Sequence, residues 1–116
     1  MNVLGIGGVF LRVEKIEELK EWYQEVLSIS LEDWNGTILH PKSGNETVFS
    51  FFKKDSDYFP KKHDVMLNFQ VENMEECLSH LDRLGIPLVK QVEKSEYGTF
   101  ATIEDPEGRW IELWEE

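Results

Sequence analysis

The stretch FATIEDPEGRWIELW, residues 100–114, decides the fold of this chain. It joins two strand-like runs, 97–104 and 109–114, through the tetrapeptide Asp105-Pro106-Glu107-Gly108. Proline and glycine are typical of tight turns, and alternation of apolar and polar side chains is typical of strands. The segment therefore predicts two strands joined by a turn at the end of the chain.

A helix is predicted upstream of these strands, and its ends are marked by local signals. Asn73 with Glu76 three residues later has the side-chain pattern of a capping box, and Gly85 and Pro87 stop the helix. Its apolar stripe consists of Met74, Cys77, Leu78 and Leu81. Strands are predicted on either side, at 64–71 and 88–92.

The same order of elements is predicted in the first half of the chain. Residues 15–27 carry apolar side chains at helical spacing, and the stripe consists of Ile16, Leu19, Tyr23, Val26 and Leu27. Asn35-Gly36 is a hairpin signal, and 41–45 is a turn-rich loop. The strands are predicted at 3–13, 29–34, 37–40 and 46–52.

The order β-α-β-β-β thus occurs twice, which predicts an α+β fold built from two βαβββ modules. We expect one domain, with module one at about 1–53, a linker at about 54–63 and module two at about 64–116. Neither module buries its helix and sheet well alone. Side by side, they would form a curved mixed sheet, with both helices on its convex face and a cup on the other.

Composition excludes several classes of partner and location. The formal net charge is −11, and affinity for nucleic acid or anionic membranes comes largely from Lys and Arg contacts to phosphates. Neither partner is therefore expected. The single cysteine, Cys77, rules out an internal disulfide, and the N-terminus lacks the features of a signal peptide, so a cytoplasmic protein is predicted. Four Trp and seven Phe in 116 residues predict a homodimer that covers apolar area.

The segments 10–29, 67–88 and 100–114, in this order, resemble the vicinal-oxygen-chelate superfamily of glyoxalases, bleomycin-resistance proteins and dioxygenases. The most specific part is the Asp-Pro-x-Gly turn before the last strand. Lys15 and Ser28 depart from the residues that the family often has at the two ends of its first helix.

The resemblance implies four metal-ligand positions in the cup, occupied here by Gly8, Ser50, Met66 and Glu112. Only Glu112 has a side chain suited to the divalent ions that such sites hold, so neither a metal nor another cofactor is expected. The three histidines are predicted to be surface residues rather than ligands: His40, His63 and His80.

Strand alternation around these positions predicts which side chains face the cup. Trp110 and Trp114 could stack on a planar ligand, Arg12 could bind a carboxylate or phosphate, and Asn68 or Gln70 could orient the ligand. The full predicted ligand-binding set is Phe10, Arg12, Ser50, Phe52, Met66, Asn68, Gln70, Trp110 and Trp114. The opposite set should pack on the helices: Val9, Leu11, Phe49, Phe51, Leu67, Phe69, Ile111 and Leu113. Alternatively, the aromatic residues fill the cup themselves or bury a dimer interface.

The leading functional hypothesis is a metal-independent protein that binds a small, partly aromatic molecule. The second is an enzyme of the lyase, isomerase or dioxygenase type that uses Glu112 as metal ligand or general base, because burial between tryptophans would suit proton abstraction. A third is an interaction module whose sheet pairs with a partner protein.

Overall fold

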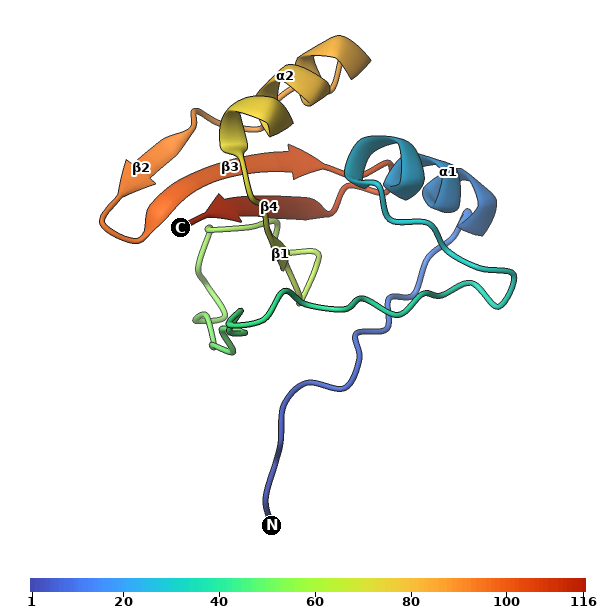
Figure 1. The fold of residues 1–116 in the computed structure, drawn as a ribbon, viewed down its shortest axis with the longest axis vertical. Coiled ribbons are helices and arrows are strands. Elements are labelled where there is room, and N and C mark those ends of the chain that lie inside the picture. The colour runs from blue at the N-terminus through green and yellow to red at the C-terminus, as the bar shows by residue number, and fades with distance from the viewer.

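The computed structural model describes all 116 residues and contains two helices and one four-stranded sheet (Figure 1). The helices are α1 (Ile16–Leu27) and α2 (Met74–Leu84), and the strands are β1 (Leu67–Gln70), β2 (Glu93–Ser95), β3 (Gly98–Glu104) and β4 (Trp110–Glu115). The strand order is β1-β4-β3-β2. β1 runs parallel to β4, and the two other pairs are antiparallel. The fold is therefore α+β with a small, open, mixed sheet. Neither helix is long and apolar enough to cross a membrane.

The second half of the chain follows the sequence prediction closely, with one exception. β1, β3 and β4 lie where strands were expected, and Asp105–Gly108 forms the turn between β3 and β4. The predicted strand at 88–92 is wrong. That segment makes a single backbone hydrogen bond to β3, from the amide of Val89 to the carbonyl of Thr102 (2.8 Å), and the ladder starts only at Glu93.

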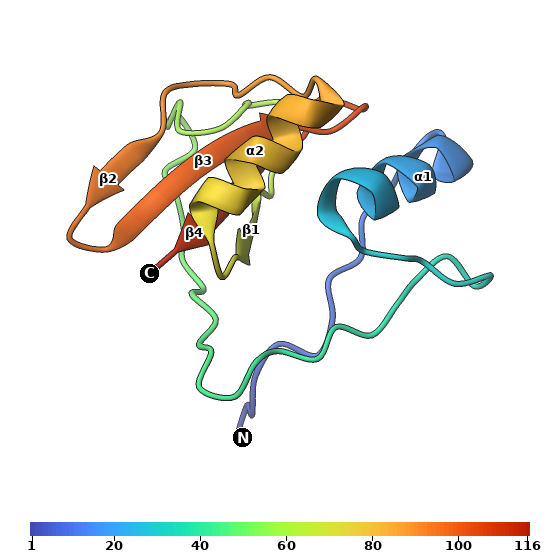
Figure 2. The same ribbon diagram turned by 45° about the horizontal axis from the view of Figure 1, so that its top comes forward.

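Both helices lie on the same side of the sheet (Figure 1). The core between helices and sheet consists of Val26, Met74, Leu81, Ala101, Ile103, Ile111 and Leu113. Ile111 and Leu113 are buried there, which confirms the predicted helix-packing face for β4. The loop from 53 to 65 lies on the opposite side of the sheet from α2 (Figures 1 and 2).

The ends of α2 confirm the local signals read from the sequence. The Asn73 side chain accepts a hydrogen bond from the amide of Glu76 (3.1 Å). Gly85 adopts the left-handed conformation (φ 71°), and the amide of Ile86 donates to the carbonyl of Leu81 (2.9 Å). α1 ends at Ser28 in the same conformation (φ 58°), where a residue with a Cβ is strained.

The first half departs from the prediction, because none of its four expected strands pairs with a neighbour. The turn at Asn35-Gly36 does form, with the amide of Glu32 donating to the carbonyl of Gly36 (2.8 Å), but no ladder extends from it. Without a ladder, alternating side chains have no face to bury. Of the predicted helix-packing residues in this half, Val9 is 56% and Phe51 90% exposed, and Leu11 and Phe49 are exposed as well. The two-module cup is therefore not formed within this single chain.

Candidate functional site

One face of the sheet gathers four of the nine side chains predicted to bind a ligand, together with Glu112. Cross-strand partners have side chains on the same face of a sheet. The register pairs Asn68 with Glu112 and Gln70 with Trp114 across β1 and β4. Across β3 and β4 it pairs Phe100 with Trp114, Thr102 with Glu112 and Glu104 with Trp110. The face opposite the helices therefore carries Asn68, Gln70, Phe100, Thr102, Glu104, Trp110, Glu112 and Trp114, and we call it the aromatic face.

Stacking and hydrogen bonding order one end of this face. The rings of Phe100 and Trp114 are stacked, with centroids 5.8 Å apart and planes within 4°. The indole N–H of Trp114 donates to the carbonyl of Tyr97 (2.7 Å). Gly98 allows β3 and β4 to come this close at their ends, because a Cβ at residue 98 would lie only 2.2 Å from the carbonyl oxygen of Glu115. These contacts fix the orientation of the Trp114 ring at one end of the aromatic face.

Glu112 lies at the centre of the aromatic face and is only 6% exposed. Each of its two carboxylate oxygens accepts one side-chain hydrogen bond. The amide of Asn68 donates to one oxygen (2.7 Å), and the hydroxyl of Tyr58 donates to the other. No lysine, arginine or histidine forms an ion pair with it. The carboxylate is thus held by neutral donors alone.

Tyr58 reaches Glu112 from the loop that lies across the sheet. Its ring stacks on Phe52 (centroids 5.2 Å apart), and the Lys90 ammonium lies 4.5 Å from its centroid. Burial, followed by the hydrogen bond to Glu112 and the charge of that carboxylate, raises the pKa of Tyr58 above its ordinary value. The phenol therefore stays protonated and donates throughout the physiological range.

Sequence reasoning missed Tyr58 and Lys90. The sequence predicts a linker at 54–63 and a strand at 88–92, which includes Lys90. The aromatic pair Tyr58-Phe59 inside a charged segment was the available signal, because large aromatic side chains in a loop usually find apolar contacts. Nothing in the sequence indicated that Tyr58 would meet Glu112, which is 54 residues away along the chain.

The residues present do not fit the metal site that the resemblance implies. No three His, Cys, Asp or Glu side chains come together anywhere in the chain. Ser50 is exposed on the unpaired first half, Gly8 has no side chain, and Met66 offers only a thioether. Glu112 alone is a good donor, and both of its oxygens are already engaged.

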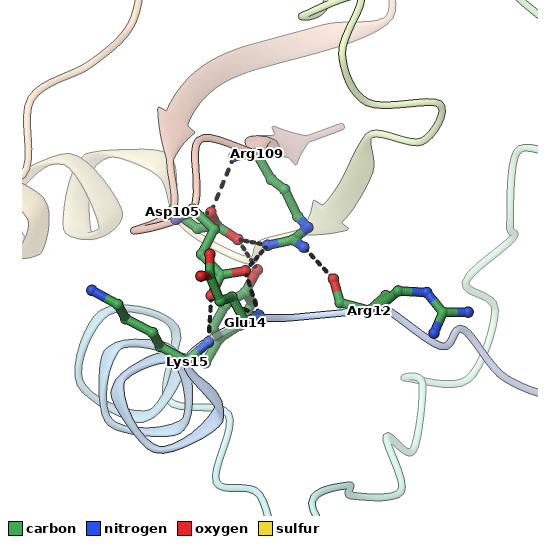
Figure 3. A network of polar contacts seen from close by, with 7 residues as sticks. Arg12, Glu14, Lys15, Asp105 and Arg109 are labelled. Atoms are coloured by element: carbon green, nitrogen blue, oxygen red, sulfur yellow. Dashed lines mark hydrogen bonds and ion pairs between the residues drawn. The ribbon is translucent and has the colours of Figure 1, made fainter.

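Phe10 and Arg12 lie away from the centre of the aromatic face, in a cleft of about 330 Å³ that also reaches Trp110. The carbonyl of Arg12 accepts a hydrogen bond from the Arg109 guanidinium (2.6 Å), while the Arg12 side chain points away from it (Figure 3). The Arg12 guanidinium forms no ion pair. His63 also lines the cleft, and its Nε2 is buried without a hydrogen-bond partner.

A polar network at the β3–β4 turn (Figure 3) includes Tyr23 and Arg109, which line this cleft. Asp105 accepts hydrogen bonds from the amides of Glu107 (2.8 Å) and Arg109 (3.0 Å) and from the hydroxyl of Tyr23 (2.8 Å). Burial and the nearby Asp105 charge raise the pKa of Tyr23 above its ordinary value. Glu107 accepts hydrogen bonds from the backbone amides of Lys15 and Glu14, which lower the pKa of its carboxyl group. The network thereby joins the start of α1 to the turn.

The structure thus divides the predicted ligand-binding residues into three groups. Asn68, Gln70, Trp110 and Trp114 share the aromatic face with Glu112, and Phe52 joins them through Tyr58. Phe10 and Arg12 line the neighbouring cleft. Ser50 is exposed and Met66 half-buried, and neither donates or accepts a side-chain hydrogen bond.

Comparison with known proteins yields one family and several similar folds. The family model described as Glyoxalase/Bleomycin resistance protein/Dioxygenase superfamily matches residues 5–113. No match is found among curated proteins. TnmS3, an antibiotic binding protein from Streptomyces sp. CB03234, is a similar solved structure, with TM-score 0.58 and 16% identity over 90% of this chain and 89% of that one. A glyoxylase/bleomycin resistance protein/dioxygenase domain from Frankia sp. EAN1pec has TM-score 0.60 and 16% identity, covering 97% and 98%. A protein of unknown function from Agrobacterium tumefaciens str. C58 has TM-score 0.58 and 21% identity, covering 99% of each chain.

Proposed function

The chain belongs to the glyoxalase/bleomycin resistance protein/dioxygenase superfamily, and we propose that it binds a small, partly aromatic molecule on the aromatic face without using a metal ion. The observation that carries this proposal is the state of Glu112, a nearly buried carboxylate whose two oxygens accept from Tyr58 and Asn68. A metal would have to displace both donors, and no group of three His, Cys, Asp or Glu side chains is present to hold it.

The surroundings of Glu112 support the binding of a planar molecule. Trp110 and Trp114 lie on either side of it along β4, two residues away in each direction, and both remain partly accessible. Small-molecule sites are usually apolar and aromatic, with a few polar groups that fix orientation. Asn68 and Gln70 supply such groups, and the unpaired Arg12 in the adjoining cleft would favour a carboxylate or phosphate on the ligand. The similar fold of an antibiotic binding protein is compatible with this function. The single Cys77 supports a cytoplasmic location.

Tryptophan fluorescence tests the proposal directly. The protein would be titrated with three planar probes of different charge: 2-naphthol, 2-naphthalenesulfonate and proflavine. We expect saturable quenching by at least one of them, with one site per chain. Trp110→Ala should weaken binding of that probe at least about fivefold, because an aromatic contact contributes about 1 kcal/mol beyond its buried area. Trp34→Phe is the matched control, since Trp34 is 65% exposed at a turn outside the aromatic face. Equal weakening in both variants, or no saturable quenching, would refute the site.

An enzyme of the same superfamily is the second candidate, and the burial of Glu112 beside tryptophans favours it. In that case Glu112 acts as general base after Tyr58 moves away, or as a metal ligand. A metal-dependent enzyme would show a higher melting temperature with one divalent ion, and Glu112→Gln would abolish that rise. The binding proposal expects no such ion.

A further inference from the structure

The loop 53–65 is joined to the rest of the chain by a single hydrogen bond. Its two backbone hydrogen bonds, donated by the amides of Ser56 and His63, are both accepted by carbonyls of the loop itself. None of its charged side chains forms an ion pair. The one hydrogen bond that leaves the loop runs from the hydroxyl of Tyr58 to Glu112. A segment with so few ties to its surroundings opens at a small cost in free energy while the rest of the protein stays folded.

Tyr58 makes the contacts that a planar ligand would make at this place on the aromatic face. Its ring is stacked on Phe52, with centroids 5.2 Å apart and planes within 22°. The Lys90 ammonium lies 4.5 Å from the centroid of the same ring, and the hydroxyl donates to Glu112. An aromatic ring, a cation and a carboxylate acceptor together recognise an aromatic molecule that carries a hydrogen-bond donor. The chain thus places a phenol of its own in such a site.

The burial of Glu112 determines what can replace Tyr58. The carboxylate is 6% exposed, and Asn68 donates to only one of its oxygens (2.7 Å). The other oxygen accepts from Tyr58 alone. A buried acceptor that loses its donor costs free energy, so a molecule that takes the place of Tyr58 has to donate to the same oxygen. An aromatic molecule without a donor on its ring would leave that oxygen unpaired.

We propose that Tyr58 is an internal competitor for the ligand, and that the ligand is an aromatic molecule with a hydroxyl or amino donor on its ring. The loop 53–65 holds the Tyr58 phenol on Glu112, and the ligand displaces the phenol and opens the loop. The apparent affinity is therefore reduced in proportion to the fraction of molecules in which Tyr58 occupies the site. The proposal rests on the ligand site proposed above, whose ligand class it narrows.

Equilibrium dialysis with 2-naphthol tests the competition. Tyr58→Phe should bind 2-naphthol at least about tenfold more tightly than the unmodified protein, because the loss of a hydrogen bond to a charged group weakens the internal competitor. Tyr97→Phe is the matched control and should leave the affinity unchanged, since Tyr97 is exposed and its hydroxyl makes no hydrogen bond. Equal or weaker binding of 2-naphthol by Tyr58→Phe would overturn the proposal.

A pair of naphthalenes that differ only in the donor tests the ligand class. We expect 2-naphthol to bind at least about tenfold more tightly than 2-methoxynaphthalene, which has the same rings but cannot donate. Equal binding of the two would overturn the requirement for a donor. Saturable binding of 2-naphthalenesulfonate without binding of 2-naphthol would also overturn it, while the ligand site itself would stand. If none of these probes binds the unmodified protein or Tyr58→Phe, both the ligand site and the competition are refuted.

Limited proteolysis of the unmodified protein gives a readout that needs no variant. Trypsin cleaves after the exposed lysines of the loop, which are Lys53, Lys54, Lys61 and Lys62. Saturating 2-naphthol should speed this cleavage several-fold, because a displaced loop is accessible to the protease. Cleavage after Lys20 in α1 and Arg83 in α2 should not become faster, since these sites open only when the helices unfold. Loop cleavage that is unchanged or slowed by bound 2-naphthol would overturn the proposal, because the ligand would then bind without displacing Tyr58.

Discussion

Replacing Tyr58 with phenylalanine removes one of the two hydrogen bonds that hold the buried Glu112 carboxylate. The aromatic ring remains, so its stacking on Phe52 and the contact with Lys90 are retained and only the hydroxyl is lost. A hydrogen bond to a charged group contributes about 1.5–3 kcal/mol, and Glu112 is only 6% exposed, so water replaces the lost donor poorly. We expect Tyr58→Phe to lower the free energy of unfolding by about 1.5–3 kcal/mol.

Urea unfolding at neutral pH measures this change, provided that the m-value is the same in both proteins. Tyr97→Phe is the matched control, because Tyr97 is exposed and its hydroxyl makes no hydrogen bond; it should change stability by less than about 0.5 kcal/mol. In the Glu112→Gln background, the Tyr58 hydroxyl would donate to a neutral amide instead of a carboxylate. Tyr58→Phe should therefore lower the free energy of unfolding by about 1 kcal/mol less there than in the protein with Glu112. A Tyr58→Phe variant as stable as the control, or a cost unchanged by Glu112→Gln, would refute the described role of Tyr58.

Neither a chelator nor added Zn²⁺, Ni²⁺, Fe²⁺ or Mn²⁺ should change the melting temperature. A bound ion would be easy to detect, because a ligand at a hundredfold excess over its Kd adds about 2.7 kcal/mol to the free energy of unfolding. A rise with one ion that Glu112→Gln abolishes would contradict the metal-free site. Ser28→Gly should raise the free energy of urea unfolding by about 0.5 kcal/mol, because relief of left-handed strain of about 1–2 kcal/mol exceeds the added flexibility of the unfolded chain; a loss of stability would argue against that backbone conformation. The free energy of unfolding should fall as pH rises above about 10, because the raised pKa of Tyr23 keeps its phenol protonated in the folded protein after it has ionised in the unfolded chain. Urea unfolding of Tyr23→Phe should show a shallower fall in stability over the same pH range. An equal fall in both proteins would exclude Tyr23 as the cause.

The sequence was most informative where one short segment determines its own structure. The ends of α2 are set by Asn73 and Gly85, which act on backbone groups within a few residues. The Asp105–Gly108 turn is likewise closed by its own aspartate. Each of these features was predicted, because the interacting atoms are close along the chain.

The sequence was least informative where structure depends on a distant partner. Residues 46–52 have the composition of a strand, but a strand forms only when a neighbouring segment pairs with its backbone N–H and C=O groups. The composition of a segment does not predict which segment that neighbour is. Tyr58 was missed for a similar reason, because its role arises from a meeting with β4. Strand alternation did place Asn68, Trp110 and Trp114 on one face with Glu112, since that inference needs only the period of the strand.

The hydrogen bonds from the start of α1 to Glu107 also bear on the order in which the chain is made. The amide of Lys15 is satisfied by a carboxylate 92 residues further along, and Lys15 itself offers no side-chain cap. During synthesis, α1 therefore leaves the ribosome long before the residue that completes its first turn. A nascent chain that ends before Asp105 holds α1 with those amides open to water and without the β3–β4 hairpin on which Tyr23 rests. Docking of α1 therefore waits about 5–18 s after Lys15 is added, because 92 residues separate Lys15 from Glu107 and elongation proceeds at about 5–20 residues per second.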